Sequence, residues 1–166
     1  VYAVMLLVTI PMTMGYADGM KLPDMLPMGY SPEYLIALFE ALGEEGRHVY
    51  LFRQLPLDML YPLLFATAYC LLTAFILKKT GKFDSALFYL CLLPVAAGVA
   101  DCLENLGLIA LLNSYPHMPE TTMMATNVFS LAKSWTTTLF FVSLIILLSW
   151  LGLNAIRRRK RRGGNL

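Results

Sequence analysis

The sequence predicts an all-α protein: a bundle of four transmembrane helices, with an amphipathic helix in the long loop between the first two. The first observation behind this prediction is composition. Hydrophobic residues make up 58% of the 166 positions and charged residues 14%, and the mean hydropathy is +0.62. Soluble domains are less apolar and more highly charged. A chain of this length has room for one domain, so residues 1–166 form a single membrane domain.

The second observation is the length of the apolar segments. A helix needs about 20 apolar residues to cross a hydrocarbon core of about 30 Å. Hydropathy places four such helices at approximately 1–16, 57–77, 83–113 and 122–156. The first has the length of a signal-peptide core, but no cleavage site followed by a soluble domain is visible, so we interpret it as a membrane helix. Because the chain begins at Val1, we expect further residues upstream of this helix.

The third observation is the distribution of basic residues. They concentrate in the turn that contains Lys78, Lys79 and Lys82, and in the tail over residues 157–166. Short basic loops stay in the cytoplasm, so we expect this turn and the C-terminus there, with segments 17–56 and 114–120 outside. A basic tail also fits nucleic acid, but beside a membrane helix it is more typical of an anchor that contacts anionic lipid. We expect no nucleic-acid partner.

The outer segment 17–56 divides into two parts. Turn-forming residues fill its first half, and Ser31 followed by Pro32 is typical of a helix start. Beyond them, apolar residues recur at helical spacing: Tyr34, Leu35, Leu38, Phe39 and Leu42. This pattern predicts an amphipathic helix over residues 31–45, lying on the bundle or on the bilayer surface.

The stretch ALGEEGRHVYLFRQLPLDMLYP, residues 41–62, resembles one found in small, uncharacterised multi-pass membrane proteins of bacteria. The resemblance implies a location in a bacterial plasma membrane. It brings no known activity with it.

Three of the predicted membrane helices carry charge at a similar depth. Asp58 precedes Lys78 by 20 residues, Asp101 follows Lys82 by 19, and Lys133 precedes Arg157 by 24. At 1.5 Å per residue these separations are roughly 30, 28 and 36 Å, near the outer boundary of the hydrocarbon. Charged side chains in lipid are costly and usually face the interior of a bundle. We therefore expect one polar chamber near the outer leaflet, with Arg47 reaching it from the outer loop.

Helical spacing selects further residues for this chamber. Residues three or four apart share one side of a helix, which groups Glu104 and Asn105 with Asp101, Ser130 with Lys133, and Tyr61 with Asp58. We predict Asp58, Asn105, Arg47, Tyr61 and Ser130 as binding residues.

The chemistry of this layer has two interpretations. In the structural one, Asp101 or Glu104 pairs with Lys133, and Asp58 pairs with Arg47 or Arg53, so that the charges only hold the helices together. In the functional one, Asp101 and Glu104 repel each other, one keeps its proton, and Lys133 stabilises negative charge. This second arrangement is an acid–base set, in which Asp101, Glu104 and Lys133 are the candidate catalytic residues.

Nothing in the sequence requires a metal or a cofactor. Cys70, Cys91 and Cys102 lie in predicted membrane helices without a CxxC pair, which is typical of buried thiols. His48 and His117 lie in outer loops, whereas a haem protein normally presents histidine inside a span. We expect neither a metal nor a cofactor.

The sequence therefore predicts an integral membrane protein that binds a lipid-like or amphipathic small molecule, or binds and converts it by acid–base chemistry. The alternative is a non-catalytic accessory or scaffold subunit, whose charged layer is purely structural. The partners expected are membrane lipids and, in the alternative, another membrane protein or a second copy of the chain. Whether the protein is an enzyme stays open.

Overall fold

The computed structural model of the protein describes residues 1–163, with the backbone alone for Ala155 and residues 157–163. Within these residues the chain is helical and contains no β-strand. Three helical stretches of the described chain are long and apolar enough to cross a membrane: Pro32–Thr80, Ala86–Ser114 and Glu120–Asn154. The predicted all-helical class is confirmed, and three helices have the length and composition of membrane spans.

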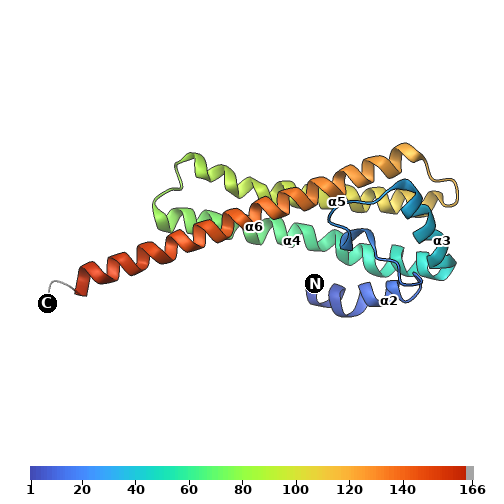
Figure 1. The fold of residues 1–166 in the computed structure, drawn as a ribbon, viewed down its shortest axis with the longest axis horizontal. Helices are drawn as coiled ribbons and strands as arrows, with labels where there is room; N and C mark the ends of the chain where they lie inside the picture. The colour runs from blue at the N-terminus through green and yellow to red at the C-terminus, as the bar shows by residue number, and fades with distance from the viewer. Residues whose placement is uncertain (164–166) are drawn as a thin grey trace.

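The bundle is built on three long helices that run side by side in alternating directions (Figure 1). They are α4 (Leu55–Thr80), α5 (Leu92–Ser114) and α6 (Glu120–Gly163). The turn between α4 and α5 lies at the same end of the molecule as the C-terminus of α6 (Figure 1). The two basic clusters of the sequence therefore belong to one end of the bundle.

The N-terminal residues differ from their prediction as a spanning helix over 1–16. They form a shorter apolar helix, Tyr2–Met14, made of α1 (Tyr2–Val4), a π-helical turn η1 (Met5–Thr9) and α2 (Ile10–Met14). Residues 1–163 thus contain three membrane-length helices, where the sequence predicts four. The short helix is tied to the bundle by the Thr9 hydroxyl, which donates to Oε1 of buried Gln54.

The helix predicted over residues 31–45 is longer than expected and does not end in a loop. It is α3 (Pro32–Val49), and its first turn is capped by Ser31, whose Oγ accepts a hydrogen bond from the Tyr34 amide at 3.2 Å. The chain bends at Gly43, whose φ of 60° lies in the region that glycine adopts without strain. A π-helical turn, η3 (Tyr50–Gln54), then joins α3 directly to α4.

Two further boundaries differ from the sequence prediction. The helix predicted from residue 83 begins as the 3₁₀ helix η4 (Ala86–Cys91), where the Ser85 side chain caps the first turn, and it becomes α-helical only at Leu92. The helix predicted to stop at residue 156 continues to Gly163. Arginine and lysine are good helix formers, so the basic residues after 156 can continue the helix. Residues 164–166 of the predicted tail lie outside the described residues.

Small residues set the distances between the long helices. A Cβ atom on Gly98 of α5 would lie 2.9 Å from the Pro62 carbonyl oxygen of α4. A Cβ on Gly107 would lie 3.0 Å from the Cβ of Thr126 on α6. Glycine at these two positions lets α5 approach its two neighbours more closely than a larger residue would.

The buried apolar residues form two clusters, one toward each end of the bundle. The cluster beside α3 packs this helix against α5 and α6, and includes Leu38, Leu55, Leu108 and Met123. The second cluster includes Phe65, Ala97, Phe140 and Leu144. On each long helix the charged residues lie between these clusters: Asp58 between Leu55 and Phe65, Asp101 and Glu104 between Ala97 and Leu108, and Lys133 between Met123 and Phe140. The fold therefore places a polar layer inside an otherwise apolar bundle.

Candidate functional site

The ammonium group of Lys133 lies at the centre of a cluster of acids. Its Nζ atom is 2.7 Å from Oδ1 of Asp24, 3.2 Å from Oδ1 of Asp101 and 2.5 Å from Oε2 of Glu104. The ammonium group donates hydrogen bonds to Asp24 and Asp101 and forms an ion pair with Glu104. Glu104 is fully buried, and the side chains of Lys133 and Asp24 are each 16% exposed.

Each long helix contributes to this cluster because of helical periodicity. Asp101 and Glu104 are three residues apart on α5 and so lie on the same side of it. Asp58 projects from α4 and Lys133 from α6, and both helices pack against α5. The chamber that the sequence predicts for Asp58, Asp101 and Lys133 is thus present as a set of neighbouring side chains.

Asp24 enters the cluster from outside the long helices. It lies in a 3₁₀ turn, η2 (Pro23–Met25), and the loop around it is fixed at two points. The Tyr34 hydroxyl donates to the Lys21 carbonyl at 2.9 Å and accepts from the Lys21 amide at 3.0 Å. The Tyr30 amide donates to Oδ1 of Asn127 on α6 at 2.8 Å. These contacts hold the turn against the bundle and direct Asp24 inward.

Tyr30 completes the surroundings of Glu104. Its hydroxyl donates to Oε1 of Glu104 at 3.2 Å, while Lys133 contacts the other oxygen of that carboxylate. Burial of the ring, followed by the charge of Glu104 and the hydrogen bond to it, raises the pKa of Tyr30 well above its usual value. The hydroxyl therefore stays protonated and acts as a donor.

Asp24 is held in its ionised form by its neighbours. Its burial alone raises the pKa, but the charge of Lys133 and the hydrogen bond from its ammonium group outweigh that effect and bring the pKa of Asp24 below its usual value of 3.8. Asp24 is therefore the ionised partner of Lys133.

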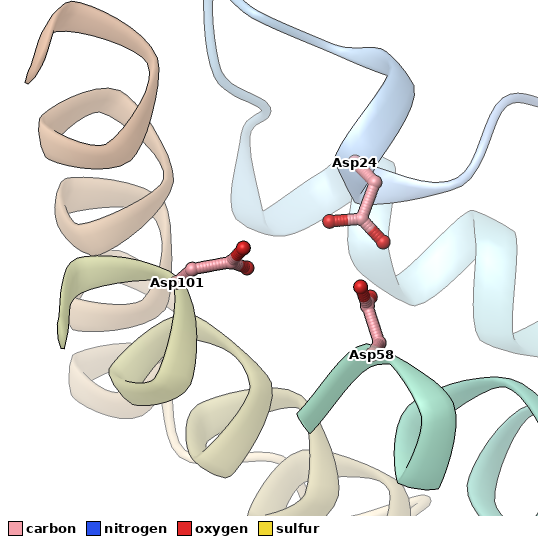
Figure 2. A group of neighbouring side chains, drawn as sticks. All are labelled: Asp24, Asp58 and Asp101. Atoms are coloured by element: carbon pink, nitrogen blue, oxygen red, sulfur yellow. The ribbon is translucent and has the colours of Figure 1, made fainter. Parts of the chain in front are cut away.

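The three aspartates face one another across a small gap (Figure 2). Their nearest carboxyl oxygens all lie within 4.8 Å of one another. Asp58 is 3% exposed. Its Oδ2 atom and Oδ2 of Asp24 are both buried without a geometrically well-formed hydrogen bond to any described residue. Unpartnered buried polar atoms are uncommon in folded proteins, so this side of the cluster has acceptor capacity that the chain does not fill.

A pocket of about 380 Å³ adjoins the unfilled side of the cluster. Its polar wall is made by Asp24, Asp58, Asp101 and Lys133. Its apolar wall comes mainly from the short N-terminal helix and from α4, with Tyr2, Met5, Leu6, Ile10, Tyr61 and Phe65. Volumes of this order are typical of sites for small organic ligands. The pocket is therefore lined by both kinds of side chain, and the charged ones lie close together.

The other residues that the sequence groups with the chamber are placed as follows. Tyr61 lines the pocket. Asn105 is fully buried, and its Nδ2 donates to the Asp58 carbonyl at 3.1 Å, which links α5 to α4. Ser130 is 1% exposed and lies beside Glu104 rather than in the pocket wall.

Arg47 is the exception among the predicted residues. Its Nη1 donates to the Phe39 carbonyl at 2.7 Å, and its guanidinium lies 4.0 Å from the centre of the Tyr115 ring. It braces α3 against the end of α5 and does not close the chamber. The ion pair between Asp58 and Arg47 or Arg53, which the structural interpretation predicts, is also not formed. Arg53 is exposed, and the ion pairs among the described side chains all involve Lys133.

Sequence reasoning missed Asp24 and Tyr30. Neither has a helical neighbour that reveals its direction, because both lie in the irregular segment before α3. The one available signal was that Asp24 is the only charged residue between Lys21 and Glu33.

Two kinds of chemistry fit the cluster on geometry alone. The oxygens of Asp24, Asp58 and Asp101 have the spacing of ligands to one divalent cation, but two of these acids already contact Lys133. Together with Glu104 these acids make four around a single ammonium, which leaves three negative charges uncompensated if all are ionised. Proton sharing among neighbouring acids is favoured in a medium of low dielectric constant, which is the basis of acid–base chemistry.

Comparison of the chain with protein-family models, with curated proteins and with solved structures found no match.

Proposed function

We propose that this chain is an integral membrane protein that binds a lipid-like or amphipathic small molecule in the pocket beside Lys133. The observation that carries the proposal is the division of the pocket into a wall of acids and a wall of apolar side chains. A lipid-like molecule has the matching division, with a polar headgroup and an apolar chain. Burial of the apolar chain of such a molecule against the apolar wall is favourable by about 25 cal/mol per Å².

The rim of the pocket supports entry from the bilayer. Tyr2 is 56% exposed and Leu6 50% exposed, and both belong to the pocket wall. In a membrane these apolar side chains face acyl chains. A molecule dissolved in the bilayer then reaches the acids without crossing an aqueous phase.

The proposed orientation places the pocket in the outer half of a bacterial plasma membrane, with the C-terminus in the cytoplasm. The basic turn after α4 and the basic end of α6 lie at one end of the bundle, and short basic segments remain cytoplasmic. The acids lie toward the opposite end of the spans, beneath α3. We infer that α3 is the amphipathic helix covering this outer end, because Leu35, Leu38, Phe39 and Leu42 are its buried face.

Conversion of the bound molecule is a further step of the same proposal. Asp101 lines the pocket next to Lys133, and Glu104 lies behind them. If the protein is an enzyme, Asp101 donates or removes a proton at the bound molecule, and Lys133 stabilises the negative charge that develops. Transport across the bilayer is not supported, because the aromatic rings of Phe65, Tyr69 and Phe140 pack below the acids.

The proposal is tested by filling the pocket without changing its charge. Ser134 lines the pocket on α6, so Ser134→Phe places a ring inside it. The matched control is Ser143→Phe, nine residues on and therefore on the opposite side of the same helix. The molecules that copurify with each protein in mild detergent are identified by mass spectrometry. We expect the wild type and Ser143→Phe to retain the same bound molecule and Ser134→Phe to lose it. Equal retention by all three proteins would end the proposal.

The alternative function, an accessory or scaffold subunit, has one specific observation in its favour. Lys133 forms ion pairs with acids from α5 and from the η2 turn, so the charges also cross-link segments that are distant in sequence. Under this alternative the partner is another membrane protein or a second copy of the chain. A stoichiometric partner after gentle solubilisation, unaffected by Ser134→Phe, would favour it over the pocket.

A further inference from the structure

The acids of the cluster are not equally compensated. Lys133 and the Tyr30 hydroxyl together contact both oxygens of Glu104. Asp58 has no ion pair, and its Oδ2 atom lacks a well-formed hydrogen bond among the described residues. Asp58 is 3% exposed and forms part of the pocket wall. The acid without an ion pair therefore faces the pocket, while Glu104, which has an ion pair and the Tyr30 hydrogen bond, does not line it.

From this asymmetry we propose that the amphipathic molecule bound in the pocket carries an ammonium headgroup, held by Asp58 together with Asp24 and Asp101. The proposal rests on the pocket function proposed above and specifies its ligand class. The headgroup donates hydrogen bonds to the Oδ2 atoms of Asp58 and Asp24, which lack well-formed partners among the described residues. No covalent step is involved.

The aromatic residues next to the acids favour an organic cation. Tyr61 follows Asp58 by one helical turn on α4 and lines the same pocket, as does Phe65 one turn further. The faces of aromatic rings attract ammonium groups, most strongly where water is excluded. The apolar wall beyond them, which includes Met5 and Leu6, accommodates an alkyl chain.

A divalent metal ion fits the same acids less well. It needs six or more oxygen ligands at about 2.0–2.6 Å, and Oδ1 of both Asp24 and Asp101 already contacts the Lys133 ammonium. Lys133 also repels a doubly charged ion twice as strongly as a singly charged one at the same distance. An ammonium headgroup needs only acceptors at hydrogen-bond distance, and it leaves the Lys133 ion pairs in place.

The test compares three probes that share one alkyl chain: octylammonium, 1-octanol and octanoate. Each is added to the purified protein in a neutral detergent near pH 7, and the melting temperature is followed by intrinsic fluorescence. MnCl₂ and MgCl₂ are tested in the same way. A ligand that binds only the folded protein raises the melting temperature in a saturable manner. We expect octylammonium to do so, octanol to have a weaker effect, and octanoate and the metal ions to have none.

The variants identify the site. Asp58→Asn removes the uncompensated acid, and we expect it to weaken the octylammonium effect by about tenfold or more, since a charged hydrogen-bond partner is lost. Asp84→Asn makes the same change at an exposed position in the turn after α4 and is the control. If Asp58→Asn does not yield folded protein, Asp101→Asn serves as the second variant with the same expectation.

The possible results separate the two proposals. Equal stabilisation by octanol, octylammonium and octanoate, abolished by Ser134→Phe, would overturn the ammonium preference and keep the pocket. Stabilisation by Mn²⁺ or Mg²⁺ that requires Asp58 would replace the ammonium by a metal. If no octyl probe binds, but Ser134→Phe still loses the copurified molecule, the ammonium inference fails and the pocket stands. If no probe binds and Ser134→Phe retains the same copurified molecules as the wild type, both proposals fail.

Discussion

Lys133 and Asp24 lie 109 residues apart in the sequence, and their side chains meet in an ion pair of 2.7 Å. The pair joins the longest helix of the bundle to a short irregular turn. It also brings a fourth acid to a layer in which Asp58, Asp101 and Glu104 already face one another. The predictions below test what this arrangement does for stability.

Replacement of Lys133 by methionine removes the only cation of the cluster. We expect Lys133→Met to lower the free energy of unfolding by an amount on the order of 3–5 kcal/mol, because the buried acids lose their counter-charge. The measurement is thermal or denaturant unfolding of the purified protein in detergent. Lys79→Met is the control: Lys79 is exposed, and its ammonium lies 5.1 Å from the centre of the Phe75 ring. A Lys133→Met protein as stable as the wild type would contradict an energetic role for the cluster.

The effect of Asp24→Asn on stability should have opposite signs in the wild type and in the Lys133→Met protein. In the wild type this substitution breaks the ion pair with Lys133, so we expect a loss of stability. In the Lys133→Met protein it removes one uncompensated negative charge, so we expect partial recovery. A double-mutant cycle of the four proteins measures this coupling directly. Additive effects would show that the two side chains do not interact in solution.

Tyr30→Phe should change the stability at alkaline pH. The folded protein raises the pKa of Tyr30 above the ordinary value of 10.0, so the unfolded chain loses this proton first. The stability contributed by the Tyr30 hydroxyl is therefore fully present below about pH 10 and is lost as the pH rises toward the folded-state pKa. We expect the wild type to be the more stable protein at about pH 8, by roughly 1 kcal/mol for the hydrogen bond to Glu104, and this advantage to disappear above about pH 10.

The matching measurement is the melting temperature of both proteins from about pH 8 to pH 11. The difference between them isolates the Tyr30 hydroxyl, because all other tyrosines and lysines are common to both proteins. A constant difference over this range would contradict the assignment.

Alanine at Gly98 and at Gly152 should have opposite consequences. A Cβ on Gly98 meets the Pro62 carbonyl oxygen at 2.9 Å and the Cβ of Ala66 at 3.0 Å, whereas a Cβ on Gly152 meets nothing within 4 Å. We expect Gly98→Ala to destabilise the protein by about 1–3 kcal/mol through overpacking of α4 against α5. Gly152→Ala should leave stability unchanged or raise it slightly, because alanine favours helix. Unfolding of the two variants under the same conditions provides the comparison.

Much of the helical part of this protein could be predicted from its sequence. The apolar segments predicted over 57–77, 83–113 and 122–156 correspond to α4, to η4 with α5, and to α6, because long runs of apolar residues have few alternatives to a membrane-length helix. The helix boundaries differ from the predicted ones where local interactions favour another structure. Ser85 begins a 3₁₀ turn before α5, and the basic tail extends α6. The segment predicted to span over 1–16 is shorter in the structure, since apolarity alone does not establish the length of a helix.

The residues of the candidate site could likewise be predicted only in part. Helical periodicity was sufficient to group Asp58, Asp101, Glu104 and Lys133, because three antiparallel helices with charges at similar depth place them at one level. It was not sufficient for Arg47, whose guanidinium reaches the nearer Phe39 carbonyl and the Tyr115 ring.

By itself, then, the sequence determined that the chain is helical, that three segments have membrane length, and that acids and a lysine on those helices share a level. These are consequences of local hydropathy and of the 3.6-residue period. Only the tertiary structure decided that Asp24 joins Lys133, that Tyr30 contacts Glu104, and that the N-terminal helix forms the apolar wall of the pocket. Those contacts come from irregular segments, whose side-chain directions follow no period and are set by packing against residues distant in the chain.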